Sequence, residues 1–342
     1  MSDGNFIDPR ERQTQIGRAE IEQKLRQTMA DGALSSGWII GGPKGAGKAT
    51  LAYRIARGLL DPGALKDDRS FDASKTSQGV NLIANAAHPD LFILEREWDE
   101  KKSKYKTEIS VDSVRELISF MNRTAAFAGA RVAIVDTADD LNRNGANALL
   151  KILEEPPKNS VILLLSSTPG RLLATIRSRC KTIELRPVVD ELVADLVQSE
   201  TNVNKDDART IAAHAGGRPG YALTLAMEEG AIAINLAHEF LRASAAGDAS
   251  SKVAVTLASK AGEQHWPIFT ETVLSGLVDA ARKGARGNRV DGPLSGADPA
   301  SLIAGWRALS DVTGRGAALN LDKAQILHAM SYDLRAALRE GA

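Results

Sequence analysis

The fold is decided by the stretch Gly42-Pro43-Lys44-Gly45-Ala46-Gly47-Lys48. It matches the first seven positions of the phosphate-loop pattern G-x-x-x-x-G-K-[ST]. An apolar run at residues 37–40 precedes it and apolar residues at helical spacing follow it, which predicts a strand, a glycine loop and a helix. Its glycines would let backbone N–H groups converge on phosphates, and its last lysine would neutralise phosphate oxygens. The alternative is a glycine turn that opens an ordinary structural helix.

The eighth position of the pattern is Ala49, where a hydroxyl group should bind Mg²⁺. A methyl group can neither bind a metal ion nor form a hydrogen bond. Thr50 follows one residue late, and one residue rotates a helical side chain by about 100°. We therefore expect the loop to have lost its metal ligand, with Thr50 as a poor substitute.

A second apolar run, Val132-Ala133-Ile134-Val135-Asp136, resembles a Walker B strand. Such a strand delivers an acidic residue to Mg²⁺, and a glutamate usually follows it to activate the attacking water. Here the next residue is Thr137, whose neutral hydroxyl cannot act as that base near neutral pH. Asp136 is therefore either a residue of a nucleotide cleft or a structural carboxylate at the end of a strand.

Two more apolar runs, at residues 90–94 and 161–165, predict buried strands. Helical patterns alternate with the strands: Asp112 can cap one helix, and another helix over residues 146–154 is stopped by two prolines. This alternation predicts an α/β fold with a parallel sheet covered on both sides. The polar residues 61–80 are expected to form a surface excursion.

No strand is predicted after Pro187, and the apolar residues follow helical patterns. A glycine-rich basic loop over residues 283–296 interrupts them, and a last helix would carry on one side Leu321, Leu327, Met330, Leu334 and Leu338. We therefore predict three domains: an α/β P-loop domain over residues 1–186, an all-α lid over residues 187–230, and an all-α C-terminal domain over residues 231–342.

The composition excludes several classes of protein. The 342 residues include 43 Lys and Arg and 43 Asp and Glu, so that no net charge attracts nucleic acid or an anionic membrane to the whole chain. The single cysteine, Cys180, excludes an intrachain disulfide and a cysteine-rich zinc site. The N-terminal residues lack the pattern of a signal peptide, and no apolar run approaches the ~20 residues needed to span a bilayer. We expect a cytoplasmic protein without a metal site.

Two further segments carry a family resemblance: Asn142-Arg143-Asn144-Gly145-Ala146-Asn147-Ala148-Leu149-Leu150-Lys151-Ile152-Leu153-Glu154-Glu155-Pro156-Pro157 and Thr175-Ile176-Arg177-Ser178-Arg179-Cys180. With the phosphate loop and the Asp136 strand, they resemble the clamp-loader ATPase family of the AAA+ class, in order over about residues 10–226. An impaired phosphate loop beside an intact Ser-Arg-Cys motif is most similar to the delta-prime branch of bacterial DNA polymerase III clamp loaders. The resemblance implies a RecA-like AAA+ domain, a helical lid and a helical collar, in a ring of subunits that opens the sliding clamp.

The resemblance also implies roles for single residues. It makes Arg179 an arginine finger, which reaches across a subunit interface to the γ-phosphate of ATP in a neighbouring motor subunit. An arginine suits this role because its planar group stays charged and pairs bidentately with phosphate oxygens. The alternative is that Arg179 only caps a helix or pairs with an acidic neighbour. Ser167 or Ser166 would stand at the sensor-1 position, whereas Gly220 occupies the place of the sensor-2 arginine and Arg218 lies two residues early.

The partners that the resemblance implies are the gamma or tau motor subunits, a delta subunit, the sliding clamp indirectly, and primer-template DNA within the complex. Arg143 and Asn144 start a helix that faces this DNA in the family and are DNA-contact candidates, although surface solvation explains them equally well. Residual binding of ATP or ADP stays open because Lys48 and the glycines remain. Related chains often hold zinc through cysteines that follow the phosphate-loop helix, but residues 61–110 contain none. His88 is expected to be a turn or packing residue.

Three functions compete. The first is a scaffold subunit of the DNA polymerase III complex, without ATPase activity of its own, which donates Arg179 in trans and helps to load the clamp on primed DNA. The second is an active motor of the same family, which would need Thr50 as its metal ligand and another base. The third is a P-loop kinase, which the helical second half disfavours because it offers no obvious acceptor pocket. Ala49, Thr137 and Gly220 together favour the first function.

Overall fold

The computed structural model describes residues 8–31, 35–127, 129–246, 251–290, 292–319 and 321–340. The chain forms two compact units: unit 1 consists of residues 1–196 and 215–221, and unit 2 of residues 197–214 and 222–342. Each unit has a hydrophobic core of its own.

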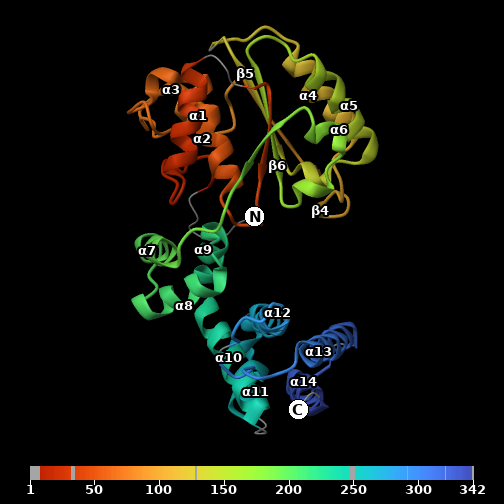
Figure 1. Cartoon of the computed structure of the whole chain (residues 1–342). Helices are drawn as coiled ribbons and strands as arrows, with labels where there is room; N and C mark the ends of the chain where they lie inside the picture. Colours follow the sequence, from red (N-terminus) through yellow and green to blue (C-terminus); the bar gives the residue numbers. More distant parts are fainter. Residues whose placement is uncertain are drawn as a thin grey trace. The chain divides into compact units, whose positions relative to one another are not determined.

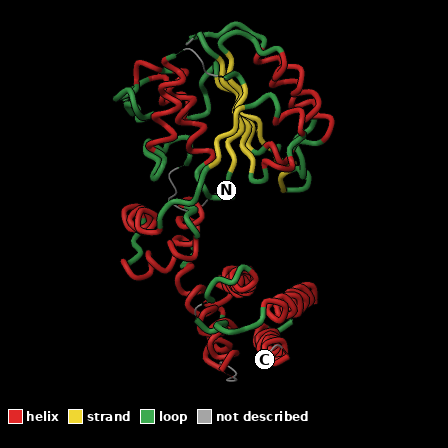
Figure 2. The backbone as a smooth tube through the Cα atoms, viewed as in Figure 1, coloured by secondary structure: helices red, strands yellow, loops and turns green. Residues whose placement is uncertain are grey.

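Unit 1 is built on a five-stranded sheet with the order β2-β5-β6-β1-β7, drawn in yellow in Figure 2. All neighbouring strands are parallel. The strands are β1 (Gly37–Gly41), β2 (Leu91–Glu95), β5 (Arg131–Asp136), β6 (Ser160–Ser166) and β7 (Lys181–Glu184). The three central strands are buried almost throughout, which explains their continuous apolar sequences. The predicted α/β fold with a parallel sheet is confirmed.

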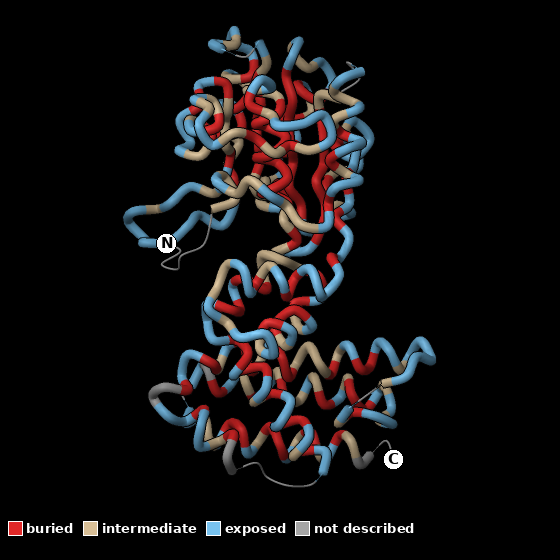
Figure 3. The backbone as a smooth tube through the Cα atoms, turned by 90° about the vertical axis from the view of Figure 1, so that its left-hand side faces the viewer, coloured by how far each residue is buried: buried red, intermediate tan, exposed pale blue. Residues whose placement is uncertain are grey.

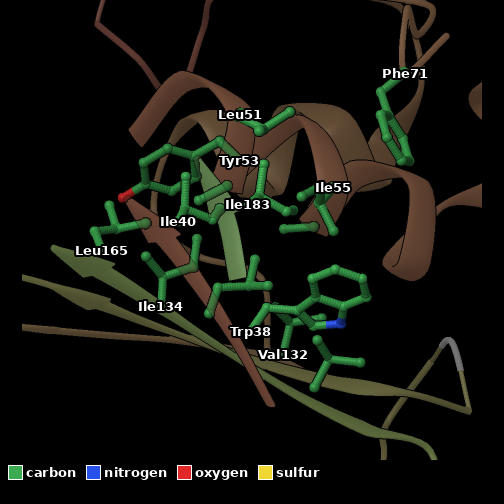
Figure 4. Close-up of a cluster of buried hydrophobic side chains, with 14 of the residues drawn as sticks. Trp38, Ile40, Leu51, Tyr53, Ile55, Phe71, Val132, Ile134, Leu165 and Ile183 are labelled. Carbon is green, nitrogen blue, oxygen red and sulfur yellow. The ribbon is translucent and has the colours of Figure 1, made fainter. Parts of the chain in front are cut away.

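Helices cover both faces of this sheet (Figure 1). One face carries α1 (Ala19–Ala30), α2 (Lys48–Leu60) and α3 (Gln78–Ala84), and the other carries α4 (Val111–Met121), α5 (Arg143–Glu154) and α6 (Ala174–Arg177). Successive residues of a strand point to opposite faces. Ile40 therefore packs in the core beneath α2, shown in Figure 4, and Ile39 packs in the core beneath α5. In Figure 3 the buried residues of unit 1, drawn in red, gather in its interior, where these strands lie.

The segment over residues 61–80 is mostly exposed or half-buried, as its polar composition predicts, but it is also anchored in the core. Phe71 in its middle is fully buried and belongs to the core beneath α2. Gly58 of α2 makes room for it, since a Cβ atom there would lie 2.6 Å from the Phe71 ring. The segment also contains a 3₁₀ turn at Pro62–Ala64 and the start of α3. The buried ring of Phe71 therefore anchors this polar segment. The polar residues around Phe71 give no sign of this contact in the sequence.

The predicted cap of α4 is wrong by two residues. The helix begins at Val111, and its N-cap is Ser110, whose side chain accepts a hydrogen bond from the Ser113 N–H. Asp112 lies inside the first turn, where it pairs with Arg115 at 2.7 Å. Both positions suit their residues, because hydroxyl side chains favour the cap and carboxylates favour the first turn of a helix.

Three short elements of unit 1 escaped the sequence interpretation. Strand β7 has one buried residue, Ile183, and therefore lacks the apolar run that marks the central strands. Strands β3 (Trp98–Asp99) and β4 (Lys104–Tyr105) form a separate antiparallel hairpin of two residues each. Their cross-strand pair of Trp98 and Tyr105 has ring centroids 5.0 Å apart. Strands this short carry too little periodicity to be recognised.

Every described element after β7 is a helix, as predicted. Helices α7 (Asp190–Glu200), α8 (Lys205–Ala215) and α9 (Pro219–Met227) have residues in both units. Unit 2 continues with α10 (Gly230–Ala246), α11 (Ser251–Ala258), α12 (Trp266–Ala285), α13 (Pro299–Leu319) and α14 (Lys323–Glu340). The described helices include none that is both long enough and apolar enough to cross a membrane.

The core of unit 2 is formed mainly by α10, α12, α13 and α14. Leu327, Met330 and Leu334 of α14 are buried in it, and Leu338 packs against it, as the predicted apolar side requires. Leu321 was wrongly assigned to this helix: it precedes the first helical residue, Lys323, and is largely exposed. The expected loop over residues 283–296 starts later, because α12 runs on to Ala285.

We predict that Phe71→Ala destabilises the protein by about 3–5 kcal/mol, because it removes a fully buried aromatic ring and leaves a cavity. Phe127 is the control, since its ring is 70% exposed and its replacement by alanine should change the free energy of unfolding by less than about 0.5 kcal/mol. Urea denaturation of the two variants measures the difference. Equal losses would contradict the structural role of Phe71.

Candidate functional site

The carboxyl ends of the strands meet at one edge of the sheet, and the predicted polar residues lie there. In the strand register Gly41 pairs with both Ser166 and Glu184, and Glu95 pairs with Asp136. Ligands of open α/β sheets bind outside this edge, where the strand order reverses. The phosphate loop follows β1, one of the three central strands, so the topology brings these groups around it.

The phosphate loop has a backbone that requires its glycines. Gly42, Gly45 and Gly47 have φ angles of 145°, 83° and 91°, which L side chains rarely adopt. A Cβ atom at Gly45 would lie 2.6 Å from the backbone nitrogen of Tyr221, and one at Gly47 would lie 2.7 Å from Nε2 of Gln15. The loop thus lies between a strand and a helix, as predicted, and other segments pack closely on it.

Segments elsewhere in unit 1 bind the carbonyl groups of this loop. They donate three hydrogen bonds: from the Gly220 N–H to Gly45, from Nε2 of Gln15 to Gly47 and from Nη2 of Arg18 to Ala46, at 2.8, 2.9 and 3.3 Å. At the predicted sensor-2 position, the chain therefore offers a backbone donor to the loop in place of an arginine side chain. Arg18 is buried, and burial lowers the pKa of its guanidinium group.

Lys48 is bound to its own loop. Its Nζ atom donates to the carbonyls of Gly42 and Pro43 at 2.7 and 3.0 Å and to Oγ of Ser167 at 3.1 Å. An ammonium group has three N–H donors, so these contacts use all of them. Burial lowers the pKa of Lys48, and the nearby Asp136, Asp139 and Glu184 oppose this shift. The structure thus brings together Lys48 and Ser167, two of the predicted site residues.

The metal-binding position of the loop is filled by an apolar contact. Ala49 is half-buried and packs against the core beneath α2. Thr50 is buried one residue further along the helix, about 100° around its axis. The position that should present a hydroxyl group to Mg²⁺ therefore presents a methyl group to the core.

Asp136 ends strand β5, as predicted, and its carboxyl group is perturbed. Burial raises the pKa of Asp136, the nearby Glu95 and Asp140 raise it further, and Lys48 partly opposes them. Thr137 follows at the position where a catalytic glutamate would stand. The strand thus presents one carboxyl group that is costly to ionise, without a base beside it.

Asp139 is a site residue that sequence interpretation missed. Its carboxylate accepts hydrogen bonds from Oγ of Ser166 at 2.7 Å, the Ser167 N–H at 2.5 Å and Oγ1 of Thr168 at 2.9 Å. Burial alone would raise the pKa of Asp139, but these hydrogen bonds together lower it below its ordinary value. Asp139 therefore fixes the end of β6 and with it Ser167, the partner of Lys48. The only sign of this site residue in the sequence was its position, three residues after Asp136.

Arg179 lies after α6, away from the phosphate loop in sequence, and its side chain is 33% exposed. Its Nη2 atom lies 2.6 Å from Oε1 of Glu154, and its Nη1 atom donates to the Thr175 carbonyl at 2.9 Å and to Oγ of Ser178 at 3.3 Å. Both parts of the alternative interpretation are thus present: Arg179 binds a carbonyl at a helix end and pairs with an acidic residue. The role of finger stays a prediction.

Arg143 and Asn144 are exposed in the first turn of α5. The preceding residue, Asn142, caps this helix by accepting a hydrogen bond from the Gly145 N–H at 2.8 Å. The two DNA-contact candidates are therefore held by a well-defined helix start, and they stay predictions.

Two further residues have local roles. Arg218 donates from Nε to the Ala215 carbonyl at 2.7 Å, and its guanidinium group lies 4.1 Å from the centroid of the Tyr221 ring. His88 is buried, and its Nδ1 atom accepts a hydrogen bond from the Asp90 N–H at 3.1 Å. Burial lowers the pKa of His88. His88 is therefore a packing residue in a turn, as predicted.

The residues of this site fit a phosphate group only in part, and they do not fit a nucleotide-bound Mg²⁺ ion. The glycine loop has the required backbone, but Lys48 must release its present acceptors before it can bind a phosphate. Ala49 offers no oxygen to a metal ion, and Asp136 alone cannot replace the pair of ligands that P-loop enzymes use.

A glycine loop after one of the central strands of a parallel sheet, with Lys48 at the start of the next helix, defines a P-loop protein. The chain belongs to the family described as "DNA polymerase III, delta subunit", whose family model matches residues 17–189.

Curated relatives carry the same kind of name. The DNA polymerase III subunit delta' of Pseudomonas aeruginosa is 41% identical over 143 residues, which cover 42% of this chain and 40% of the relative. That of Escherichia coli is 34% identical over 181 residues, which cover 53% and 51%. The chain thus spans about half the length of the curated relatives it matches. A gamma subunit-related protein of Thermotoga maritima, known from a crystal structure, is 19% identical, with coverage of 93% and 100% and a TM-score of 0.39.

We predict that Asp136→Asn stabilises the protein at pH 7 by about 0.5–1 kcal/mol, because it removes a carboxylate that burial makes costly to ionise. Since the pKa is raised in the folded state, the contribution of Asp136 to stability is present at low pH and is lost as the pH rises through the raised value. The gain should therefore shrink in acid. Urea denaturation across this pH range measures it.

The control for this prediction is Asp112→Asn, which changes an exposed carboxylate in the first turn of α4 and should bring no gain. A loss of stability on Asp136→Asn at pH 7 would show that the charged form of Asp136 is structurally required.

Proposed function

We propose that this chain is a delta-prime-like scaffold subunit of the DNA polymerase III clamp loader. It has no ATPase activity of its own, donates Arg179 in trans to a neighbouring motor subunit, and helps to load the sliding clamp on primed DNA. Membership of the family and the delta' names of the relatives support this function. The three-part division into P-loop domain, lid and collar belongs to the same proposal.

The observation that carries the proposal is the state of the phosphate loop. All three donors of the Lys48 ammonium group are bound to acceptors of the chain itself, and Ala49 packs into the core where a metal ligand should stand. Both features stabilise the loop as a structural element. Neither helps to bind or activate a nucleotide.

Arg179 is the residue that we propose to act on ATP. An arginine side chain offers N–H donors in a planar geometry that matches phosphate oxygens. Arg179 is partly exposed, although it lies in a chain segment whose neighbours Ile176 and Cys180 pack against the core beneath α5. A rigid base with an accessible charged end suits a group that must reach into another subunit.

The remaining parts of the proposal concern partners. We propose that gamma or tau motor subunits and a delta subunit surround this chain, and that the clamp is contacted indirectly. Primer-template DNA would approach the first turn of α5, where Arg143 and Asn144 are exposed. Such contacts would bind phosphates without reading sequence, so they should weaken as the salt concentration rises.

We expect the purified chain to hydrolyse ATP at no more than the background rate, because it lacks both the metal ligand and the base. A phosphate-release assay on the wild type and on Lys48→Ala and Lys44→Ala variants measures this. Lys44 is exposed in the same loop and serves as the control. Robust turnover that Lys48→Ala abolishes and Lys44→Ala retains would identify an active motor instead.

In a clamp loader reconstituted with this chain, we predict that Arg179→Ala slows hydrolysis at the neighbouring motor site by a factor on the order of 10³, because arginine fingers contribute 10³–10⁵ to such rates. The total ATP turnover of the complex should fall by the fraction that this one site contributes. Assembly, measured by size-exclusion chromatography, should not change.

Arg177→Ala is the matched control for Arg179→Ala, since it removes an exposed arginine two residues away. If both variants leave the turnover of the complex unchanged, Arg179 is not a finger. If both lower it equally, the loss comes from the charge of the segment and not from this side chain.

A further inference from the structure

Arg179 is held inside its own chain by three acceptors from two helices. Glu154, the last residue of α5, lies 2.6 Å from Nη2, while the Thr175 carbonyl and Oγ of Ser178 accept from Nη1. We infer that Glu154 is the positioning residue of Arg179: it fixes the guanidinium group so that its remaining donors keep one orientation toward the partner's nucleotide. This inference rests on the proposed function.

The contacts leave part of the guanidinium group available. An arginine has five N–H donors. The described contacts use both hydrogens of Nη1 and one hydrogen of Nη2, which leaves the Nε–H and the second hydrogen of Nη2. Two donors are the number that a bidentate contact to phosphate oxygens needs. Arg179 therefore keeps donors for phosphate oxygens while Glu154 stays bound, as the positioning role requires.

The core of unit 1 brings Glu154 and Arg179 together. Leu153 and Cys180, the chain neighbours of the pair, both pack in the core beneath α5. They meet over Gly37, where a Cβ atom would lie 2.9 Å from Sγ of Cys180 and 3.0 Å from Cδ2 of Leu153. A glycine at the start of β1 thus lets the end of α5 approach the segment of Arg179. Buried packing therefore places the two backbone segments side by side, so that the side chains of Glu154 and Arg179 lie within reach of each other.

The position of Glu154 also favours a cation. The last turn of an α-helix carries partial negative charge from its free carbonyl groups, and a glutamate there adds a full charge. Glu155, the next residue, is exposed as well, but its backbone N–H binds the Lys151 carbonyl and it makes no described contact with Arg179. The two glutamates therefore offer a matched pair, of which one touches the arginine.

The pair contributes little to the stability of the fold. The side chains of Arg179 and Glu154 are 33% and 47% exposed, and exposed ion pairs are weak because water screens them. Removing the carboxylate should therefore leave folding and ring assembly intact while it releases the guanidinium group. An effect on turnover would then come from orientation.

The test uses the reconstituted clamp loader with four versions of this chain: wild type, Glu154→Gln, Arg179→Ala and the double variant. The turnover that depends on Arg179 is the difference between the wild type and Arg179→Ala. We expect Glu154→Gln to lower the kcat of this Arg179-dependent turnover about tenfold, because a misplaced catalytic group slows the reaction. The KM for ATP and the melting temperature should stay unchanged, and the double variant should match Arg179→Ala.

Glu155→Gln is the control and should behave as the wild type. The inference is overturned if Glu154→Gln leaves turnover unchanged while Arg179→Ala lowers it, or if it raises turnover, which would make Glu154 a competitor for the arginine. It is also overturned if Glu154→Gln lowers turnover further in the Arg179→Ala background. A lack of effect of Arg179→Ala itself would instead refute the proposed function, and the positioning role with it.

Discussion

The ammonium group of Lys48 closes the phosphate loop on itself. Its hydrogen bonds to Gly42, Pro43 and Ser167 join the end of β1, the loop and the end of β6. Gln15 and Gly220 bind further carbonyls of the same loop from either side of the sequence. The lysine of the phosphate-loop motif thereby links the ends of two strands at the carboxyl edge of the sheet, and the nearby carboxylates oppose the effect of burial on its pKa.

The fold was predictable from the sequence wherever a strand is buried on both faces. β1, β5 and β6 have continuous apolar sequences because helices cover them on each side. Edge strand β7 buries only Ile183, and its four residues fit neither a buried nor an alternating pattern. Phe71 was missed for a different reason: its burial depends on Gly58, and a contact across thirteen residues leaves no periodic trace.

The residues of the candidate site also fall into two groups, those that the sequence predicted and those that it did not. Lys48, Asp136 and Ser167 were found because each belongs to a motif with a fixed spacing from a strand. Asp139 and Arg18 were not, since their roles arise only when the loop, the end of β6 and the segment before α1 meet in space. A sequence motif reflects chemistry that all members of a family share. The groups that now hold this loop closed follow no such pattern.

Helix α5 connects the two surfaces through which this chain would act on its neighbours. Arg143 is exposed in its first turn and Glu154 ends it, so they lie eleven positions apart, or about 17 Å along the helix. Between them, Ala146, Leu149 and Ile152 are buried in one core. A helix packed along its length cannot bend without opening that core, so the orientation of Glu154 relative to the sheet is set by the fold itself. The backbone at Glu154 is therefore fixed by the packing beneath α5, and its side chain meets that of Arg179 at the surface.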